Sequence, residues 1–233
     1  MEAVLRIFRG DREDGRVEDY RVPLHEGMVV LDAIHYVQAH HASDLACRWN
    51  CKAGRCGSCS AEVNGKPKLM CMTRMDQFPA GDPITVSPLK AFPVIKDLVS
   101  DLTHIAAQYQ SIRPWVQTAS APPPDREFLQ SVEEREQLDG LWECILCFCC
   151  STACPSYWWN GERYLGPAIL LQAYRWIADS RDEKTGERLD ELEDPFRLYR
   201  CHTIMNCTKT CPKSLNPAKA IAEIKKMMVE RTI

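Results

Sequence analysis

The chain has 233 residues, of which 45% are hydrophobic and 26% charged, and its 29 Lys and Arg face 32 Asp and Glu for a net charge of -3. This composition excludes an intrinsically disordered chain and leaves room for one large core or two small ones. Lys and Arg are spread along the chain and form no basic run, so we expect no nucleic-acid partner.

The first hundred residues predict a small α+β unit. Residues 3–8 and 17–22 have the character of two strands, and the turn-rich GDREDG between them predicts a hairpin. The segment MVVLDAIHYVQAHH, from Met28, predicts a helix. Its apolar face would comprise Val29, Ala33, Ile34 and Val37. The strings AEV and KLM bracket Asn64-Gly65, a strong hairpin signal, and ITVSP predicts a last strand.

Prolines mark a boundary after this unit. Pro114 and the run APPPD at 121–125 cannot continue a helix or a central strand, so we predict a proline-rich linker at residues 111–130. Beyond it, the pattern is helical. Three signals support this. Ser131 and Glu134 form a capping box, Pro167 and Pro217 are placed where first-turn prolines occur, and Asn216 can cap the last helix.

We therefore predict an α+β chain with two domains. The first, residues 1–110, is a β-grasp domain, and the second, residues 131–233, is mostly α-helical. Residues 181–193, RDEKTGERLDELE, are strongly charged, and we expect them to form a solvated helical or loop surface.

Cysteine is the outlier of the composition. Thirteen cysteines fall into three groups, at 47–71, 144–154 and 201–211. A disulfide framework would require an oxidising compartment, but the chain is long, its N-terminal sequence lacks the order of an export signal, and the cysteine count is odd. In a reducing compartment clustered cysteines bind metal more often, so the three groups predict more than one metal site.

The first group has the spacing C-x4-C-x2-C with a distant fourth cysteine, as in plant-type [2Fe-2S] ferredoxins. The predicted ligands are Cys51, Cys56, Cys59 and Cys71. Gly54 and Gly57 can adopt the positive φ angles that turn backbone amides toward sulfur. Zinc is the main competitor, since it also takes four thiolates, although zinc ribbons usually pair two short CxxC knuckles. Cys47 fits neither spacing, and we expect a small thiol, at least partly buried, that binds no metal.

The second and third groups predict two clusters that exchange ligands. CILCFCCSTACP has the bacterial ferredoxin spacing, in which three cysteines bind one cubane and the fourth reaches a second cluster. The matching run, Cys201 to Cys211, carries Ile204 where its second cysteine should be. The predicted [4Fe-4S] ligands are Cys144, Cys147, Cys150 and Cys211. The cysteines that remain for the other cluster are Cys154, Cys201 and Cys207. We predict that this cluster is [3Fe-4S], because an apolar residue lies where its fourth ligand should be. Cys149 is spare.

Three clusters of different type predict a two-cluster bacterial-ferredoxin-like domain behind a [2Fe-2S] domain, acting together as an electron-transfer chain. No GxGxxG fingerprint follows a strand and no P-loop is present, so we expect flavin and nucleotide to bind elsewhere. No Ser-His-Asp or paired-carboxylate arrangement predicts catalysis. The reactions at both ends are expected on other subunits or on a docked carrier.

Several strings resemble the iron-sulfur subunits of the succinate dehydrogenase and fumarate reductase family. They are LWECILCFCCSTACPSYWWNG, LGPAILLQAYRW, DPFRLYRCHTIMNCTKTCPKSLNP and KAIAEIKKMM, and before the linker NCKAGRCGSCSAEVNGKPKLMC. The resemblance is dense over residues 141–228 and looser before the linker, where Cys47 and RWNC depart from the family's pattern. It implies [2Fe-2S], [4Fe-4S] and [3Fe-4S] clusters on the same eleven cysteines, ordered from an FAD-containing flavoprotein subunit toward a membrane quinone, with FAD on that partner only.

The resemblance also implies a quinone site shared with membrane anchor subunits. Its contacts, by position in the family, are Pro155, Ser156, Trp158, Trp159, His202 and Ile204. A tryptophan N–H can donate to a quinone carbonyl, and we assign that role to Trp159. Histidine is the side chain suited to proton transfer near neutral pH, and His202 is a candidate for proton delivery. Without the resemblance, the aromatic run would be interpreted as core packing.

We predict a subunit peripheral to the cytoplasmic side of a bacterial inner membrane, or to the matrix side of a mitochondrial one. No segment approaches the roughly eighteen apolar residues of a spanning helix, so anchor subunits must hold it. The alternatives are a fumarate reductase subunit, a zinc-bound assembly module without redox activity, and a freely diffusing multi-cluster ferredoxin.

Four basic residues lie beside predicted cluster ligands in the sequence: Arg48, Arg55, Lys209 and Lys213. They either favour the reduced clusters or are ordinary surface charges.

Overall fold

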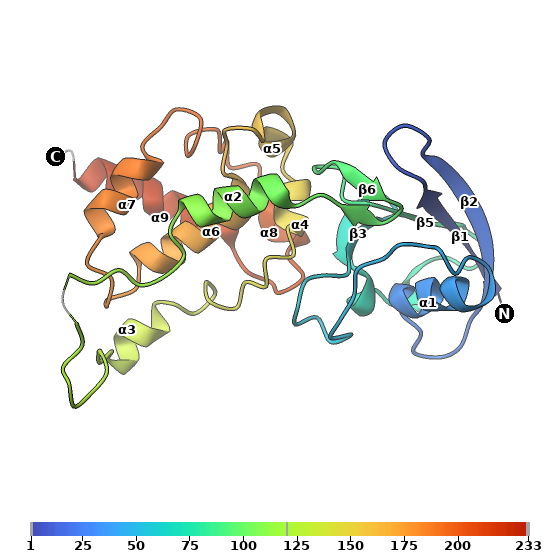
Figure 1. Ribbon diagram of the computed structural model, residues 1–233, viewed down its shortest axis with the longest axis horizontal. Coiled ribbons are helices and arrows are strands. Elements are labelled where there is room, and N and C mark those ends of the chain that lie inside the picture. Colours follow the sequence, from blue (N-terminus) through green and yellow to red (C-terminus); the bar gives the residue numbers. More distant parts are fainter. Residues whose placement is uncertain (1, 120, 232–233) are drawn as a thin grey trace. The chain divides into compact units, whose positions relative to one another are not determined.

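The computed structural model describes residues 2–119 and 121–231, which divide into two compact units whose elements are labelled in Figure 1. The first unit runs up to Leu102 and also contains Ile145–Ala153, and the second contains Thr103–Cys144 and the chain from Cys154 onward. This division differs from the boundary expected near residue 110. Helix α2 (Thr103–Ser111) belongs to the second unit, and the middle of the second cysteine group packs with the first.

The first unit is built on a five-stranded mixed sheet in the order β2-β1-β5-β3-β4. Strands β1 (Glu2–Arg9) and β2 (Arg16–Pro23) form the predicted antiparallel hairpin, and β5 (Ile84–Ser87) lies parallel to β1. Helix α1 (Val30–His40) follows the hairpin. The remaining elements are β3 (Ser60–Val63), β4 (Lys66–Leu69), η1 (Met70–Met72), η2 (Met75–Gln77), β6 (Val94–Lys96), β7 (Val99–Ser100) and α4 (Cys149–Thr152). The mixed sheet and its helix agree with the β-grasp prediction.

The turn between β3 and β4 is made by Asn64 and Gly65, whose φ angles are 48° and 70°. Two left-handed residues match the twist of hairpin strands, and Gly65 adopts this conformation without steric cost. Asn64 Oδ1 accepts the backbone N–H of Thr85 at 2.7 Å, which ties the turn to β5. At the other end of the hairpin, the N–H of Met70 donates to the carbonyl oxygen of Cys59 at 3.1 Å. The hairpin therefore brings Cys59 and Cys71, two of the predicted [2Fe-2S] ligands, together.

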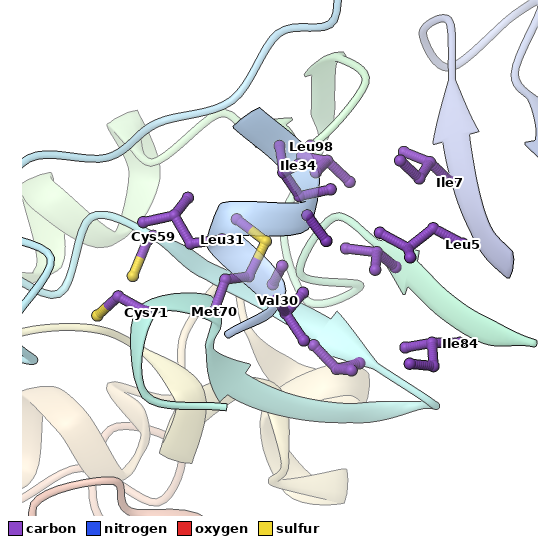
Figure 2. Packing of buried hydrophobic residues seen from close by; sticks show 14 of the residues in the cluster. Leu5, Ile7, Val30, Leu31, Ile34, Cys59, Met70, Cys71, Ile84 and Leu98 are labelled. Carbon is purple, nitrogen blue, oxygen red and sulfur yellow. The ribbon is translucent and has the colours of Figure 1, made fainter. Parts of the chain in front are cut away.

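An apolar core fills the space between α1 and the sheet. Figure 2 shows Leu31 and Ile34 of α1 in the same cluster as Leu5 and Ile7 of β1. The helix face predicted from the sequence is buried at Ala33, Ile34 and Val37, whereas Val29 is half-buried and caps the helix. Cys59 and Cys71 lie at the edge of this cluster, with their sulfur atoms turned away from the aliphatic side chains (Figure 2). The core thus holds the backbone of two predicted ligands rigidly.

The second unit is helical, as predicted. Besides α2, its helices are α3 (Val132–Glu136), α5 (Pro155–Asn160), α6 (Gly166–Ile177), α7 (Thr185–Leu192), α8 (Asn206–Thr210) and α9 (Pro217–Glu230). Ser131 Oγ accepts the N–H of Glu134 at 3.1 Å, and Asn216 Oδ1 accepts that of Lys219 at 2.9 Å, so both expected caps are confirmed. Pro167 and Pro217 lie in first turns. Of the helices in the described residues, none is long and apolar enough to cross a membrane.

Most of residues 181–193 are exposed or half-buried, as expected, but a buried ion pair contradicts the expectation of a solvated surface at two of them. Arg188 of α7 and Asp182 are 3% and 8% exposed, and their side chains pair at 2.7 Å. Arg188 also donates, at 2.8, 2.9 and 2.7 Å, to the carbonyl oxygens of Ile112, Arg113 and Trp115. The pair therefore fastens the segment after α2 to α7, and this part of the predicted linker is held in place. The prediction was wrong at Asp182 and Arg188, because composition does not distinguish a paired buried charge from a solvated one.

The ionisation of Asp182 makes this contact pH-dependent. Burial opposes ionisation, but hydrogen bonds from Arg188 and from the backbone N–H groups of Gln117 and Lys184 hold the pKa of Asp182 below its ordinary value. A carboxyl whose pKa is lower in the folded state stabilises the fold above its unfolded-state pKa. It loses that contribution as the pH falls through the folded-state pKa.

We expect Asp182→Asn to lower the free energy of unfolding by about 3 kcal/mol at neutral pH, because Arg188 would remain buried without its counter-charge. The difference from wild type should shrink below about pH 4, where the wild-type carboxyl is progressively protonated. Urea denaturation at a series of pH values measures both effects. Asp19→Asn, which removes an exposed partner of Arg6, is the control and should change stability by less than about 1 kcal/mol. A difference that does not vary with pH would contradict the assignment.

Candidate functional site

The loop that carries Cys51 turns its backbone toward sulfur. Lys52 and Gly54 have φ angles of 53° and 62°, and the N–H groups of Ala53 and Arg55 donate to Cys51 Sγ at 3.4 and 3.2 Å. Residues that alternate between left- and right-handed conformations make a concave set of N–H donors, which binds anions and is common at iron-sulfur sites. The loop therefore fits a cluster of negatively charged sulfurs.

Gly57 has a second role that the sequence did not reveal. Its φ is 71°, and a Cβ atom there would lie 2.6 Å from the carbonyl oxygen of Ile145 and 3.0 Å from Cys147 Cα. A side chain is therefore excluded both by backbone conformation and by the chain packed against it. Within the first unit, the first cysteine loop and residues 145–147 are in direct contact. The glycine spacing predicted only the turn, because the contact joins segments about ninety residues apart.

The thiols of the first group differ in how readily they ionise. Hydrogen bonds from the Cys51 backbone and from Ser58 Oγ, 3.0 Å away, lower the pKa of Cys56 to about 6. Burial raises the pKa of Cys59 to about 12, and Cys59 and Cys71 are only 3% and 6% exposed. A buried thiolate needs a nearby positive charge, which iron ions in a cluster provide. The donor set fits a thiolate-bound metal cluster.

The second group forms a similarly wound loop. Leu146 and Phe148 have φ angles of 51° and 59°, uncommon for residues other than glycine, and α4 begins immediately after them. Cys147 and Cys150 are 9% and 8% exposed. The two other cysteines assigned to this cluster lie in the second unit, where they pack beside an apolar cluster formed by Leu141, Leu171, Leu215 and Ala220: Cys144 and Cys211. The loop again combines left-handed residues with thiols of little exposure.

The cysteines without an assigned metal lie against the core of the first unit. Cys47 is half-buried, as expected, and burial raises its pKa to about 12. Cys149 is fully buried, and its Sγ donates to Ser60 Oγ at 3.8 Å. Both thiols are therefore placed as packing groups.

The third group surrounds a hollow of about 340 Å³ in the second unit. Its lining includes Cys154, Cys201 and Cys207, and no other cysteine among the described residues lines it. Thr203 and Met205 have φ angles of 56° and 68°, and Ile204 between them lines the same hollow and is 49% exposed. Three thiols and an aliphatic side chain thus share one site. In the described chain no group of three or more Cys, His, Asp or Glu is arranged around a single metal ion.

The predicted quinone contacts are only partly brought together. Four of them line the same hollow as the three thiols: Pro155, Ser156, His202 and Ile204. Trp158 and Trp159 do not line it and are 42% and 80% exposed on α5. The interpretation of the aromatic run as core packing is therefore wrong for both tryptophans, although Tyr157, at 3% exposure, is buried.

Comparisons with known proteins decide the family. Residues 4–107 match the family described as a 2Fe-2S iron-sulfur cluster binding domain, and residues 143–216 match the 4Fe-4S dicluster domain. The chain is 56% identical to the succinate dehydrogenase iron-sulfur subunit of Paracoccus denitrificans, over 98% of this chain and 89% of that protein. The chain belongs to the family of succinate dehydrogenase iron-sulfur subunits.

Solved structures agree with this assignment. A chain of the Mycobacterium smegmatis Sdh1 complex in the apo form is 37% identical, with a TM-score of 0.85 over 99% of this chain and 96% of that one. A hypothetical protein from Helicobacter pylori, 14% identical with a TM-score of 0.58 over 97% of this chain and 39% of that one, shows likeness of fold alone. As a succinate dehydrogenase iron-sulfur subunit, the chain is the electron-transfer part of an oxidoreductase and carries 2Fe-2S and 4Fe-4S domains.

Cys149 and Cys150 offer a test of the ligand assignment, because they are adjacent and both buried. We expect Cys149→Ala to retain the iron content of the purified complex, since the bacterial ferredoxin spacing leaves this thiol out. Cys150→Ala should lose about four irons per chain, because it removes a [4Fe-4S] ligand. Iron and acid-labile sulfide per chain measure the outcome. Equal iron loss from the two variants would contradict the assignment.

Proposed function

We propose that this subunit carries electrons from an FAD-containing flavoprotein subunit, where succinate is oxidised, to a membrane quinone through [2Fe-2S], [4Fe-4S] and [3Fe-4S] clusters. The proposed [2Fe-2S] ligands are Cys51, Cys56, Cys59 and Cys71. Those of the [4Fe-4S] cluster are Cys144, Cys147, Cys150 and Cys211, and those of the [3Fe-4S] cluster are Cys154, Cys201 and Cys207. The spacing of the cysteines, their loops and the family support this assignment.

The observation that carries the proposal is the three-thiol hollow. Ile204 lines the hollow and occupies the position where the ferredoxin spacing has the second cysteine of the run, which would be the fourth ligand of this cluster. Its side chain has no atom that binds iron. An iron at that corner would lack a protein thiolate, so three irons are expected to remain. The hollow also admits solvent at Ile204, which is 49% exposed, and a partner could reach it there.

The chain's own residues hold the clusters and adjust their charge. When bound, each cluster accepts and releases one electron. In the first cysteine loop, the backbone N–H groups of Ala53 and Arg55 donate to Cys51 Sγ and would stabilise the charge that reduction adds. Arg48 lines a cavity of about 640 Å³ together with Cys56 and Cys147, and its guanidinium is fixed by a 2.8 Å hydrogen bond to the carbonyl oxygen of Ser100. Arg48 is thus a held positive charge in that unit, whereas Arg55 is exposed.

Electron paramagnetic resonance of the oxidised complex tests the three-thiol site. Oxidised [2Fe-2S] and [4Fe-4S] centres are diamagnetic, whereas an oxidised [3Fe-4S] centre has an odd spin, so we expect about one spin per chain. Ile204→Cys supplies a fourth thiol and should remove most of this signal while raising the iron content by about one per chain. Ile204→Ala, which opens the same corner without a thiol, is the matched control and should keep the signal.

An oxidised, iron-replete complex without the signal would overturn the [3Fe-4S] assignment. So would an Ile204→Cys variant whose signal and iron content equal those of Ile204→Ala. Zinc in place of iron would favour the non-redox assembly module instead.

The quinone contacts are part of the same proposal. Ser156, His202 and Ile204 line the hollow, so a quinone bound there would lie beside the last cluster of the chain. Trp159, on α5 after Cys154 and Pro155, is 80% exposed, which leaves its indole N–H available to a ligand held between this chain and an anchor subunit. We assign Trp159 the hydrogen bond to a quinone carbonyl and keep His202 as the candidate for proton delivery.

We expect Trp159→Phe to raise the KM for quinone about tenfold, because one hydrogen bond to the quinone carbonyl is lost. Succinate oxidation with a soluble dye that accepts electrons at the flavoprotein should be unchanged. Trp115→Phe is the control, since Trp115 is also an exposed indole, 50% accessible, of the second unit. Equal effects of the two variants on the KM for quinone would contradict the role of Trp159.

The partners and location follow from this function. We place the subunit against a flavoprotein subunit and membrane anchors, on the cytoplasmic side of a bacterial inner membrane or the matrix side of a mitochondrial one. Fumarate reduction would use the same clusters in the opposite direction. The name of the relative that is 56% identical favours succinate oxidation. Co-purification with a flavoprotein and anchors would exclude a freely diffusing ferredoxin.

A further inference from the structure

Tyr164 lines the three-thiol hollow, and no cysteine spacing points to it. It lies between α5 and α6, is 1% exposed, and shares the hollow with Cys154, Cys201 and Cys207. The most buried tyrosine of the second unit therefore lines the same hollow as the thiols assigned to the last cluster.

The position of Tyr164 is set from several directions. Its backbone N–H donates to the carbonyl oxygen of Asn160 at 2.7 Å, and its carbonyl oxygen accepts Gln108 Nε2 at 3.1 Å. Its ring lies tilted against that of Tyr157, with centroids 6.4 Å apart. Gln108, itself 7% exposed, also accepts the Tyr157 hydroxyl at 3.0 Å. The backbone and ring of Tyr164, which lines the hollow, are thus held in place.

The Tyr164 hydroxyl is a phenol, and an ordinary phenol keeps its proton at physiological pH because its pKa is about 10. A neutral phenol in a site of low dielectric constant is a hydrogen-bond donor at every physiological pH. A donor to a ligand sulfur stabilises the more negative redox state.

We propose that the Tyr164 hydroxyl donates a hydrogen bond to Cys201 Sγ and thereby raises the reduction potential of the [3Fe-4S] centre. This inference rests on the function proposed above for that centre. Reduction adds one electron to the centre, the hydrogen bond strengthens as charge on the sulfur grows, and the proton stays on the phenol oxygen. The role of Tyr164 is to keep the last cluster easily reduced, so that electrons are drawn toward the quinone end.

A potentiometric titration of the [3Fe-4S] signal in the purified complex tests the proposal. Tyr164→Phe removes only the hydroxyl and should shift the equilibrium between the reduced and oxidised centre about three- to tenfold toward the oxidised form. For a one-electron couple this lowers the midpoint potential by about 28 to 59 mV. Tyr157→Phe is the matched control, because it removes a buried hydroxyl of the same aromatic pair that donates to Gln108 Oε1. Its midpoint should equal that of wild type.

Proton electron–nuclear double resonance on the oxidised signal gives a second measurement that a purely structural role would not affect. We expect an exchangeable proton coupling, lost in D2O, that is present in wild type and Tyr157→Phe and missing in Tyr164→Phe.

An unchanged midpoint with an unchanged proton coupling in Tyr164→Phe would overturn the proposal. Loss of the [3Fe-4S] signal from Tyr164→Phe alone would also overturn it, since the hydroxyl would then be needed for assembly. A wild-type complex without any [3Fe-4S] signal is a different failure, because it would remove the proposed function of the hollow together with this inference.

Discussion

The inward winding of the cysteine loops is the constraint on which the rest of the structure depends. Lys52, Leu146, Phe148, Thr203 and Met205 all adopt positive φ angles without being glycine. Each such residue costs about 1 kcal/mol, so the loops persist only where something compensates. In the first loop, the N–H groups of Ala53 and Arg55 donate to Cys51 Sγ. Under the proposed function, bound clusters provide the compensation in each loop.

The three groups give their thiols different environments. The first loop supplies hydrogen bonds to Cys51 and Cys56, and those to Cys56 lower its pKa. Around the hollow, burial raises the pKa of Cys154 and Cys207. Metal binding to such thiols contributes to folding as well as to electron transfer. Differences in donors, burial and exposure also separate cluster potentials, and a chain of clusters needs that separation to move electrons in one direction.

Each unit uses a buried ion pair to fix a segment that has no regular structure. In the first unit, Asp97 is fully buried, receives Arg9 Nε at 3.1 Å and accepts the N–H of Ala46 at 2.8 Å. Ala46 begins the approach to the first cysteine loop, so this carboxylate anchors the loop at its start. In the second unit, Arg188 and Asp182 hold the residues after α2 in the same manner. Buried pairs of this kind contribute position more than stability, because desolvation offsets much of their attraction.

The sequence by itself determined the elements whose causes are local: the hairpin at Asn64-Gly65, the caps at Ser131 and Asn216, and the cysteine spacings, since a loop of a few residues wraps one cluster. The three-thiol site at Ile204 could likewise be predicted, because one cysteine of the ferredoxin spacing is missing there. Only the tertiary structure decided that residues 145–153 pack with the first unit, that Gly57 meets Cys147, and that Tyr164 faces the thiols. These contacts join segments tens of residues apart, and their energy comes from burial and pairing that depend on where the other segment lies. Composition and periodicity report only the preferences of the chain around each residue.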